Sequence, residues 1–400
     1  MVGSISARAP EPVLHLGRRA RRLAAPLLEL SVPMACYQGR TPGGLAARVL
    51  VAGNSAGGAS RYFLKRIFAD FDACNADHQR RVSLLALPQA LRRMRDEADL
   101  TLADVDRFVA RRMFAGEQYL RVPEWLLSTL PVPTDVAALM RGNNSIRSDV
   151  RVIERSGLSP RISRDPHDFE RFHQEMYLPF TGQRHGSSAV LRERGALKRH
   201  FNRGGLMWIM QDGREIAGAL YDTKGSSFRL LNFGTPGGDY EPVKRGAMAA
   251  AYWFGIEMAK AGGFTLIWLG GTRPCAKDGV FVYKRKWGVH STPKPDARQD
   301  LLVRWREPGP FAREYLTHSP LLFRDQDGLA LVAAVEPGVS PERTRDLLWS
   351  EGVGRSFIIG ATANSHPVSR EILLRDPLHA PPTVGETTPR AVREKSVAPG

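Results

Sequence analysis

Residues 229–271 read RLLNFGTPGGDYEPVKRGAMAAAYWFGIEMAKAGGFTLIWLGG, and residues 277–288 read KDGVFVYKRKWG. Together they predict a strand, a Gly-rich turn, a long helix, a second strand and a short aromatic, basic helix. Pro242 suits the first turn of the long helix and Gly262–Gly263 suit its end, so the segment is typical of a parallel β-α-β unit. A turn that opens onto a helix N-terminus offers unpaired N–H groups and the helix dipole to an anion. We therefore expect an anionic ligand at this turn.

The overall composition predicts a globular protein with a strong positive charge. The chain has 400 residues, of which 42% are hydrophobic and 24% charged. That length predicts two domains plus tails. Fifty-seven Lys and Arg against 41 Asp and Glu give a net charge of +16. Such a charge favours nucleic acid, an acidic membrane surface or a phosphorylated cofactor, and composition does not choose among them.

The chain divides into five predicted segments. Residues 1–40 are rich in Ala, Arg and Pro without periodicity, and we expect a disordered basic leader there. Alternating strand and helix patterns predict a first unit at residues 41–144 and a second at 145–340. A helix and strand extension follows at 341–375, and the Pro- and Thr-rich residues 376–400 are expected to be disordered.

The cysteines and the apolar runs predict a cytoplasmic protein. Cys36, Cys74 and Cys275 lie far apart and form no paired-cysteine motif, which fits a reducing compartment. No run reaches the length that a membrane-spanning helix needs, so membrane contact would be peripheral. Residues 18–36 contain a basic stretch followed by an apolar one, which is the order found in signal peptides. However, Pro26 and Glu29 interrupt the apolar stretch, and no clean cleavage motif follows.

The stretch from the Gly-rich turn to Gly288 resembles the acyltransferase domain of the FemAB-like branch of the GNAT superfamily, which includes CelD/BioF2-like proteins. The resemblance rests on Asp278-Gly279, Tyr283-Lys284 and Trp287-Gly288, with the upstream run Arg184–Gly186, and covers roughly residues 145–335. It implies an α/β (α+β) GNAT-like fold, with tandem units, mixed central sheets and a degenerate first unit. It also implies an N- or O-acyltransferase.

The resemblance places the cofactor at the turn before the long helix, on Lys244, Arg245, Gly246 and Ala247. The general GNAT pyrophosphate loop has the pattern Gln/Arg-x-x-Gly-x-Gly/Ala. Here Val243 and Met248 stand at its other two positions, so an acyl-CoA is expected but acetyl-CoA itself is left open. Lys244 and Arg245 are unfavourable in the first turn of a helix unless an anion lies beside them. The alternative is that both side chains point into solvent.

Acyl transfer to an amine needs a neutral nucleophile, a polarised carbonyl and a proton for the leaving group. Tyr283 is a candidate proton donor, and Lys284 and Arg285 could neutralise phosphates or a developing oxyanion. Asp278 is a candidate base, although an aspartate at a helix start is more often an N-cap. His185 could act as a base or contact substrate, with an ordinary surface role as the alternative.

Other residues carry weaker signals. Arg184 and Trp287 are candidate substrate contacts, with helix-end packing as the alternative for Trp287. Cys275 has no recognisable His partner for covalent catalysis. The GNSAGG run at residues 53–58 fits neither nucleotide-binding glycine pattern and is interpreted as a turn. No metal-ligand motif is present, so we expect no metal.

The expected reaction is acyl transfer from acyl-CoA to an amine or hydroxyl acceptor, which could be a small molecule or a precursor of a cell envelope or polysaccharide. The basic charge keeps aminoacyl-tRNA as a second candidate donor, for a peptide ligase. A non-catalytic nucleic-acid binder or scaffold is the rival class, although no nucleic-acid-binding domain motif is seen. The acceptor and the oligomeric state are not encoded in any of these patterns.

Overall fold

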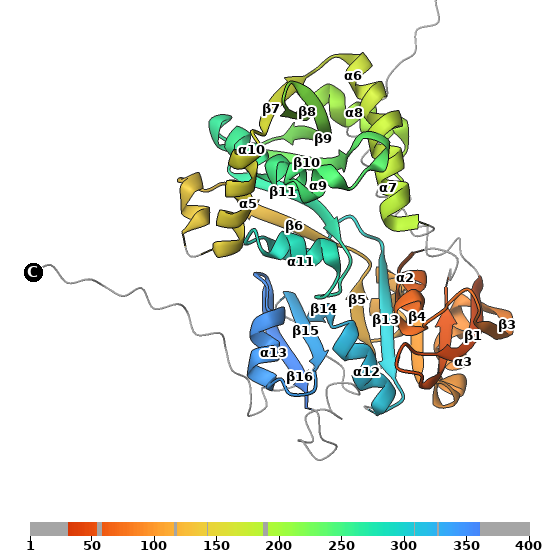
Figure 1. Cartoon of the computed structure of the whole chain (residues 1–400). Helices are drawn as coiled ribbons and strands as arrows, with labels where there is room; N and C mark the ends of the chain where they lie inside the picture. Colours follow the sequence, from red (N-terminus) through yellow and green to blue (C-terminus); the bar gives the residue numbers. More distant parts are fainter. Residues whose placement is uncertain are drawn as a thin grey trace, which may run out of the picture.

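The computed structural model describes residues 31–53, 58–115, 118–141, 143–186, 191–307, 309–325 and 328–360. Its strands form three sheets of six, seven and three strands, with helices packed against them (Figure 1). Each sheet contains one parallel pair of strands among antiparallel ones. The predicted α/β class with mixed sheets is therefore confirmed. The predicted disorder of residues 1–30 and 376–400, and the end of the predicted extension at 361–375, lie outside the described residues.

The six-stranded sheet has the order β3-β1-β2-β4-β13-β5, and its parallel pair is β2 with β4. Its apolar faces are covered by α2 and α12 on one side and by α3 and α4 on the other. Its strands are β1 (Ser31–Arg40), β2 (Ala46–Ala52), β3 (Asn75–Ser83), β4 (Leu100–Asp106), β5 (Leu120–Pro123) and β13 (Gln299–Trp305). Its helices are α2 (Gly58–Ile67), α3 (Leu87–Met94), α4 (Arg107–Met113) and α12 (Pro310–His318).

The seven-stranded sheet has the order β12-β6-β11-β10-β9-β8-β7, with β10 and β11 parallel. Its strands are β6 (Leu126–Pro131), β7 (Ser159–Ser163), β8 (Gly204–Gln211), β9 (Arg214–Lys224), β10 (Ser227–Gly234), β11 (Leu266–Thr272) and β12 (His290–Pro293). The helices around it are α5 (Asn144–Arg155), α6 (Pro166–Arg171), a π-helical turn (Phe172–Tyr177), α7 (Leu178–His185), α8 (Arg194–Arg203), α9 (Glu241–Lys244), α10 (Ala247–Ala261) and α11 (Gly279–Arg285).

Period-2 alternation along β8 assigns the two faces of the seven-stranded sheet. Met207 and Ile209 pack under α5 and α10, whereas Leu206 and Trp208 face the π-helical turn and α8. Both sets are fully buried. The helices therefore sandwich this sheet, as its near-continuous apolar strands require.

The three-stranded sheet completes the molecule and lies below α11 in Figure 1. Its order is β14-β15-β16, and α13 connects the parallel strands β15 and β16. The elements are β14 (Leu321–Asp325), β15 (Gly328–Ala334), α13 (Pro341–Leu348) and β16 (Val353–Ile359). The helix and strand predicted after residue 340 are thus one crossover of a sheet that begins earlier in the chain.

Several local predictions are confirmed. The Asp165 carboxylate accepts the His167 N–H ahead of Pro166, which starts α6. The Asp212-Gly213 pair joins β8 to β9 as a tight hairpin with both residues at positive φ. The chain from β10 through α10 to β11 forms the predicted parallel β-α-β unit.

Two predictions are wrong in detail. Residues 31–40 are not disordered but form β1, because Val32, Met34 and Cys36 alternate toward the core. The long helix does not run unbroken from Pro242, since Gly246 adopts φ +96° and separates α9 from α10. This break places Lys244 at the end of α9 instead of in the first turn of α10.

The two predicted units exchange strands across residue 144. β6 of the first predicted unit pairs with β11 and β12, and β13 of the second pairs with β4 and β5. Sequence patterns show where strands lie but not which sheet they join. The exchange ties the units together, and their folding as separate domains stays a prediction.

Candidate active site

The parallel strands β10 and β11 part toward their carboxyl ends. Their pairing joins Ser227–Arg229 to Leu266–Trp268 and, within the described residues, goes no further, although β10 runs to Gly234 and β11 to Thr272. The register of β11 against β6 also shifts after Trp268. Backbone groups and side chains at the carboxyl ends of parallel strands commonly bind ligands.

The amine of Lys284, a residue of α11, lies where β10 and β11 separate. Its side chain is 4% exposed, and Nζ donates to the carbonyl of Gly271 on β11 at 3.0 Å. A Cβ atom at Gly270 would lie 3.9 Å from both the Leu231 carbonyl of β10 and Lys284 Nζ. Burial lowers the pKa of Lys284 to about 7, with Asp278 acting in the opposite direction. Near neutral pH the amine is thus available in both protonation states.

Further polar atoms near the ends of these strands lack partners. Thr272 Oγ1 on β11 and Asn232 Oδ1 on β10 are buried and have no hydrogen-bond partner among the described residues. Buried polar atoms usually have a partner, and unpartnered ones call for an explanation such as a bound ligand. Sequence reasoning missed both residues, although the Gly270-Gly271 pair at the end of a predicted strand was a signal of an irregular strand end.

Tyr283 lies on a different face of α11 from Lys284. Its ring packs edge-on against Tyr252 of α10 at 5.3 Å, and the Lys286 amine lies 4.3 Å from its centre. The hydroxyl oxygen is buried without a partner among the described residues. Burial raises the pKa of Tyr283 well above its usual range, and nearby Tyr252 and Asp149 act in the same direction. Tyr283 therefore stays a neutral phenol, with its ring packed on α10.

The structure supports the capping interpretation of Asp278. Its Oδ1 accepts the N–H groups of Val280 and Phe281 at the start of α11. Its Oδ2 accepts the Tyr62 hydroxyl at 3.0 Å and lies 3.8 Å from Arg66. Both oxygens are engaged, so Asp278 fixes α11 against α2.

Trp287 lies in the core instead of on a binding surface. Its side chain is fully buried and packs against Tyr252 at 5.4 Å. It cannot contact a substrate in this arrangement, in agreement with the packing alternative.

The predicted cofactor residues surround the break between α9 and α10. Lys244 pairs with Glu241 and is 61% exposed, and Arg245 is exposed as well. Gly246 lies against Val152, and Ala247 is fully buried. The two cations point outward, so the solvent alternative describes Lys244 in this structure, and cofactor binding there stays a prediction.

Arg184 and His185 lie at the end of α7. Gln183 donates to the carbonyl of Gly237 at 2.8 Å, which fixes this end of α7 against the Gly-rich turn. The Arg184 guanidinium stacks on Tyr240 at 4.8 Å, and Tyr240 contributes to the raised pKa of Tyr283. The side chain of His185 lies outside the described residues. Arg184 therefore lies beside the Gly-rich turn, in contact with Tyr240.

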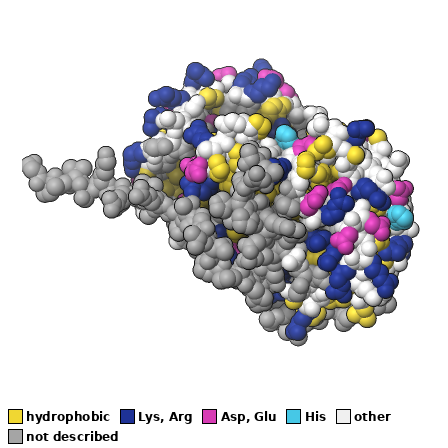
Figure 2. Space-filling model, turned by 90° about the horizontal axis from the view of Figure 1, so that it is seen from below, with side chains coloured by type: hydrophobic (Ala, Val, Ile, Leu, Met, Phe, Trp, Pro, Cys, Tyr) yellow, Lys and Arg dark blue, Asp and Glu magenta, His cyan; other side chains and the backbone are white. Residues whose placement is uncertain are grey.

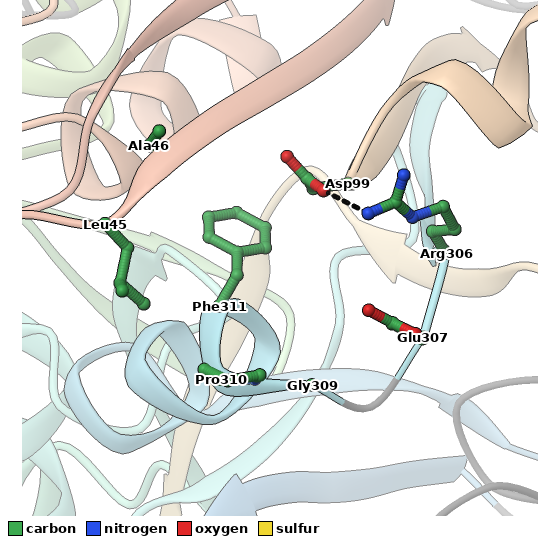
Figure 3. Close-up of a pocket in the computed structure, with 8 residues that line it drawn as sticks. All are labelled: Leu45, Ala46, Asp99, Arg306, Glu307, Gly309, Pro310 and Phe311. Atoms are coloured by element: carbon green, nitrogen blue, oxygen red, sulfur yellow. Dashed lines mark hydrogen bonds and ion pairs between the residues drawn. The ribbon is translucent and has the colours of Figure 1, made fainter.

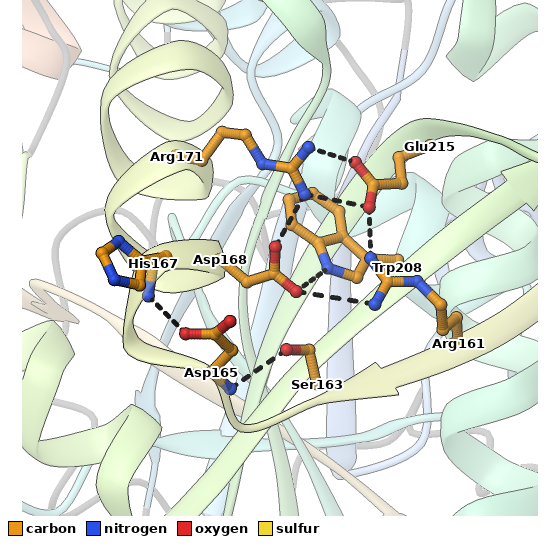
Figure 4. Close-up of polar contacts among 8 residues, drawn as sticks. All are labelled: Arg161, Ser163, Asp165, His167, Asp168, Arg171, Trp208 and Glu215. Atoms are coloured by element: carbon orange, nitrogen blue, oxygen red, sulfur yellow. Dashed lines mark hydrogen bonds and ion pairs between the residues drawn. The ribbon is translucent and has the colours of Figure 1, made fainter.

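In two other polar regions, charged side chains pair with one another. A hollow of about 190 Å³ beside α12 contains Arg306, which is paired with Asp99 (Figure 3). A second cluster joins β7, α6 and β9 around Trp208, where each charge has an opposite partner (Figure 4). Its members are Arg161, Asp168, Arg171 and Glu215. The four charges of the cluster around Trp208 are therefore all paired, and Arg306 in the hollow is paired as well.

Surface charge, metal-ligand residues and helix hydropathy do not indicate a further site in the described part of the chain. Figure 2 shows Lys and Arg interspersed with Asp and Glu on the face seen from below, instead of one continuous basic patch. Among the described residues no group of three or more His, Cys, Asp and Glu could hold a metal ion. Over the same part of the chain, every helix is too short or too polar to cross a membrane.

No family model and no curated protein matches the chain. It is similar to the solved structure of FemX, with 14% identity, 55% of this chain and 76% of that chain covered, and a TM-score of 0.38. The structure of L-PGS from Bacillus licheniformis matches with 11% identity, coverage of 68% and 84%, and a TM-score of 0.35. A GCN5-related N-acetyltransferase from Sphaerobacter thermophilus matches with 12% identity, coverage of 68% and 80%, and a TM-score of 0.29. At TM-scores below 0.5 these matches carry no argument about the family or the function of this chain.

Proposed function

We propose that the protein is an acyltransferase whose reaction takes place where β10 and β11 part. The observation that carries the proposal is the buried amine of Lys284, held at this parting with a pKa lowered to about 7. A buried lysine with a depressed pKa is suited to general-base chemistry. The unpartnered atoms of Thr272 and Asn232, near the ends of the same two strands, support a ligand in this region.

In the proposed reaction the neutral amine of Lys284 takes a proton from the acceptor amine or hydroxyl. The acceptor then attacks the carbonyl carbon of the acyl donor, a new C–N or C–O bond forms, and the bond to the leaving group breaks. The protonated Lys284 returns its proton to the leaving thiolate or ribose oxygen. Lys284 is preferred to Tyr283 in this role because its amine lies where β10 and β11 separate, whereas the Tyr283 ring packs on α10.

The donor is proposed to be acyl-CoA, with aminoacyl-tRNA as the second candidate. Both donors are polyanions, which suits the net charge of +16. The acceptor is proposed to be an amine or hydroxyl compound, such as a precursor of the cell envelope.

The donor is tested by calorimetric titration of the whole protein with CoA, short- and long-chain acyl-CoAs, and bulk tRNA at two salt concentrations. Saturable binding of an acyl-CoA with a matching rise in thermal stability supports the proposal. Binding of tRNA alone, with a steep loss in salt, indicates the aminoacyl-tRNA alternative or a plain nucleic-acid binder. Binding of neither overturns the proposal.

A further inference from the structure

A second hollow, of about 680 Å³, lies between α11 and the residues that follow α13. That volume falls in the range of sites that bind small molecules. Its apolar lining includes Val282, Leu347 and Trp349, and the first two side chains are 39% and 52% exposed. Tyr283 also lines this hollow, whereas Lys284 does not, so the hollow is separate from the Lys284 amine.

Arg285 is the unusual residue in this hollow. Burial lowers its pKa, and no carboxylate is close enough to act in the opposite direction. Its guanidinium has no ion-pair or hydrogen-bond partner among the described residues, and its Nη1 atom is buried. A half-buried arginine normally has an anionic partner, because desolvating a charge is costly. The missing partner points to an anion supplied from outside the chain.

Besides Tyr283, whose hydroxyl has no partner among the described residues, two neutral hydrogen-bond donors line the same hollow. Ser350 is 2% exposed, and its Oγ atom has no partner among the described residues. The indole Nε1 of Trp349 is likewise buried without a partner in the described structure. Hydroxyl and indole N–H groups both donate to carboxylate or phosphate oxygens. Together with Arg285 they are unpartnered donors in a hollow that also has an apolar lining.

The remaining charges limit how much negative charge a ligand can carry. The other cation, Lys286, is already paired with Asp149. Asp346, which is paired with Arg345, and Glu351 also line the hollow and would repel a second negative charge.

We propose that this hollow binds a small monoanion with an apolar chain, whose carboxylate or phosphodiester group is held by Arg285, Ser350 and Trp349. The apolar chain lies against Val282 and Leu347. The proposal stands independently of the acyltransferase function, because it concerns binding at a separate site.

The proposal is tested by isothermal titration of the whole protein with hexanoate, dibutyl phosphate, hexanol and hexylamine. We expect saturable binding of hexanoate, dibutyl phosphate or both, at least about tenfold tighter than binding of hexanol, and no binding of hexylamine. Hexanoate alone would identify a carboxylate ligand, and dibutyl phosphate alone a phosphodiester. Equal affinity for hexanol and the anions, or no saturation by either anion up to about 10 mM, would overturn the proposal.

Variants locate the binding in the hollow. Arg285→Gln should weaken anion binding at least about tenfold and Ser350→Ala about threefold, because a charged hydrogen bond contributes more than a neutral one. Arg151→Gln removes an exposed arginine on α5 and should leave the affinity unchanged. Thermal unfolding of each variant confirms that it is folded. Anion binding that survives in folded Arg285→Gln would contradict the assignment.

Discussion

The charge cluster around Trp208 and the polar groups around α11 are both partly or wholly buried, yet they differ in how they are paired. Around Trp208, Asp168 accepts from the indole Nε1 at 3.1 Å and from Arg171 at 2.7 Å, and Glu215 pairs with both arginines. Around α11, Lys284 binds one backbone carbonyl, and Arg285 has no partner among the described residues. A satisfied network stabilises a fold, whereas unsatisfied polar groups cost stability and are typical of functional sites.

The largest expected effect follows from removing the Lys284 amine. Lys284→Gln should lower kcat/KM for acyl transfer at least about 100-fold, because general-base catalysis contributes about 10²–10⁴. Initial rates are measured with the donor identified by titration. Lys260→Gln removes an exposed lysine of α10 and serves as the matched control. A rate for Lys284→Gln equal to that of the control would remove Lys284 from the mechanism.

The buried amine of Lys284 should also lower the free energy of unfolding at neutral pH. Its folded-state pKa is about 7 against an ordinary value of 10.5, so the unfolded chain binds more protons between these pH values and stability rises with pH there. Lys284→Met should be the more stable protein at pH 7, and its advantage should shrink by roughly 3 kcal/mol toward pH 10. Denaturant unfolding at the two pH values measures this. A constant difference would show that Lys284 keeps an ordinary pKa.

Removing a partner from the charge cluster around Trp208 should lower the free energy of unfolding, whereas Lys284→Met should raise it at pH 7. Asp168→Ala leaves the Trp208 indole N–H and Arg171 without their acceptor and should lower the free energy of unfolding by about 2 kcal/mol. Turnover should not change, because the cluster leaves no charge for a ligand. Asp72→Ala removes an exposed partner of Arg61 and should change stability by less than about 0.5 kcal/mol. Equal effects in the two variants would mean that the network contributes little.

The smallest effect is expected at Asp278. Asn caps helices about as well as Asp, so Asp278→Asn should keep α11 in place and change kcat/KM less than about threefold. Steady-state kinetics of Asp278→Asn and Lys284→Gln, measured side by side, compares the two values of kcat/KM. A loss as large as that of Lys284→Gln would restore Asp278 as a base.

The comparison also shows what the sequence could and could not predict. Pro242, Gly262 and Gly263 mark local backbone requirements, so the β-α-β unit was predictable. The break at Gly246 was not, because a glycine inside a helical pattern is often tolerated. The alternating burial of Val32, Met34 and Cys36 in β1 was overlooked in a stretch rich in Ala, Arg and Pro.

Within the candidate site, sequence reasoning selected α11 but could not tell its faces apart. Lys284 and Tyr283 are neighbours in sequence, yet one contacts β11 and the other α10. Thr272 and Asn232 carry no motif, and their lack of partners depends on how two distant strands part. Likewise, the hollow at Arg285 depends on the packing of α11 beside α13, which local patterns do not encode.

The most direct test of the account is the pKa of Lys284 itself. Heteronuclear NMR of the lysine side chains follows their titration, and Lys284→Gln identifies the resonance by its loss. The account predicts a midpoint of about 7, caused by burial at the parting of β10 and β11. A midpoint at the ordinary value of 10.5 would contradict it, because the amine would then stay protonated at neutral pH and could not serve as a base.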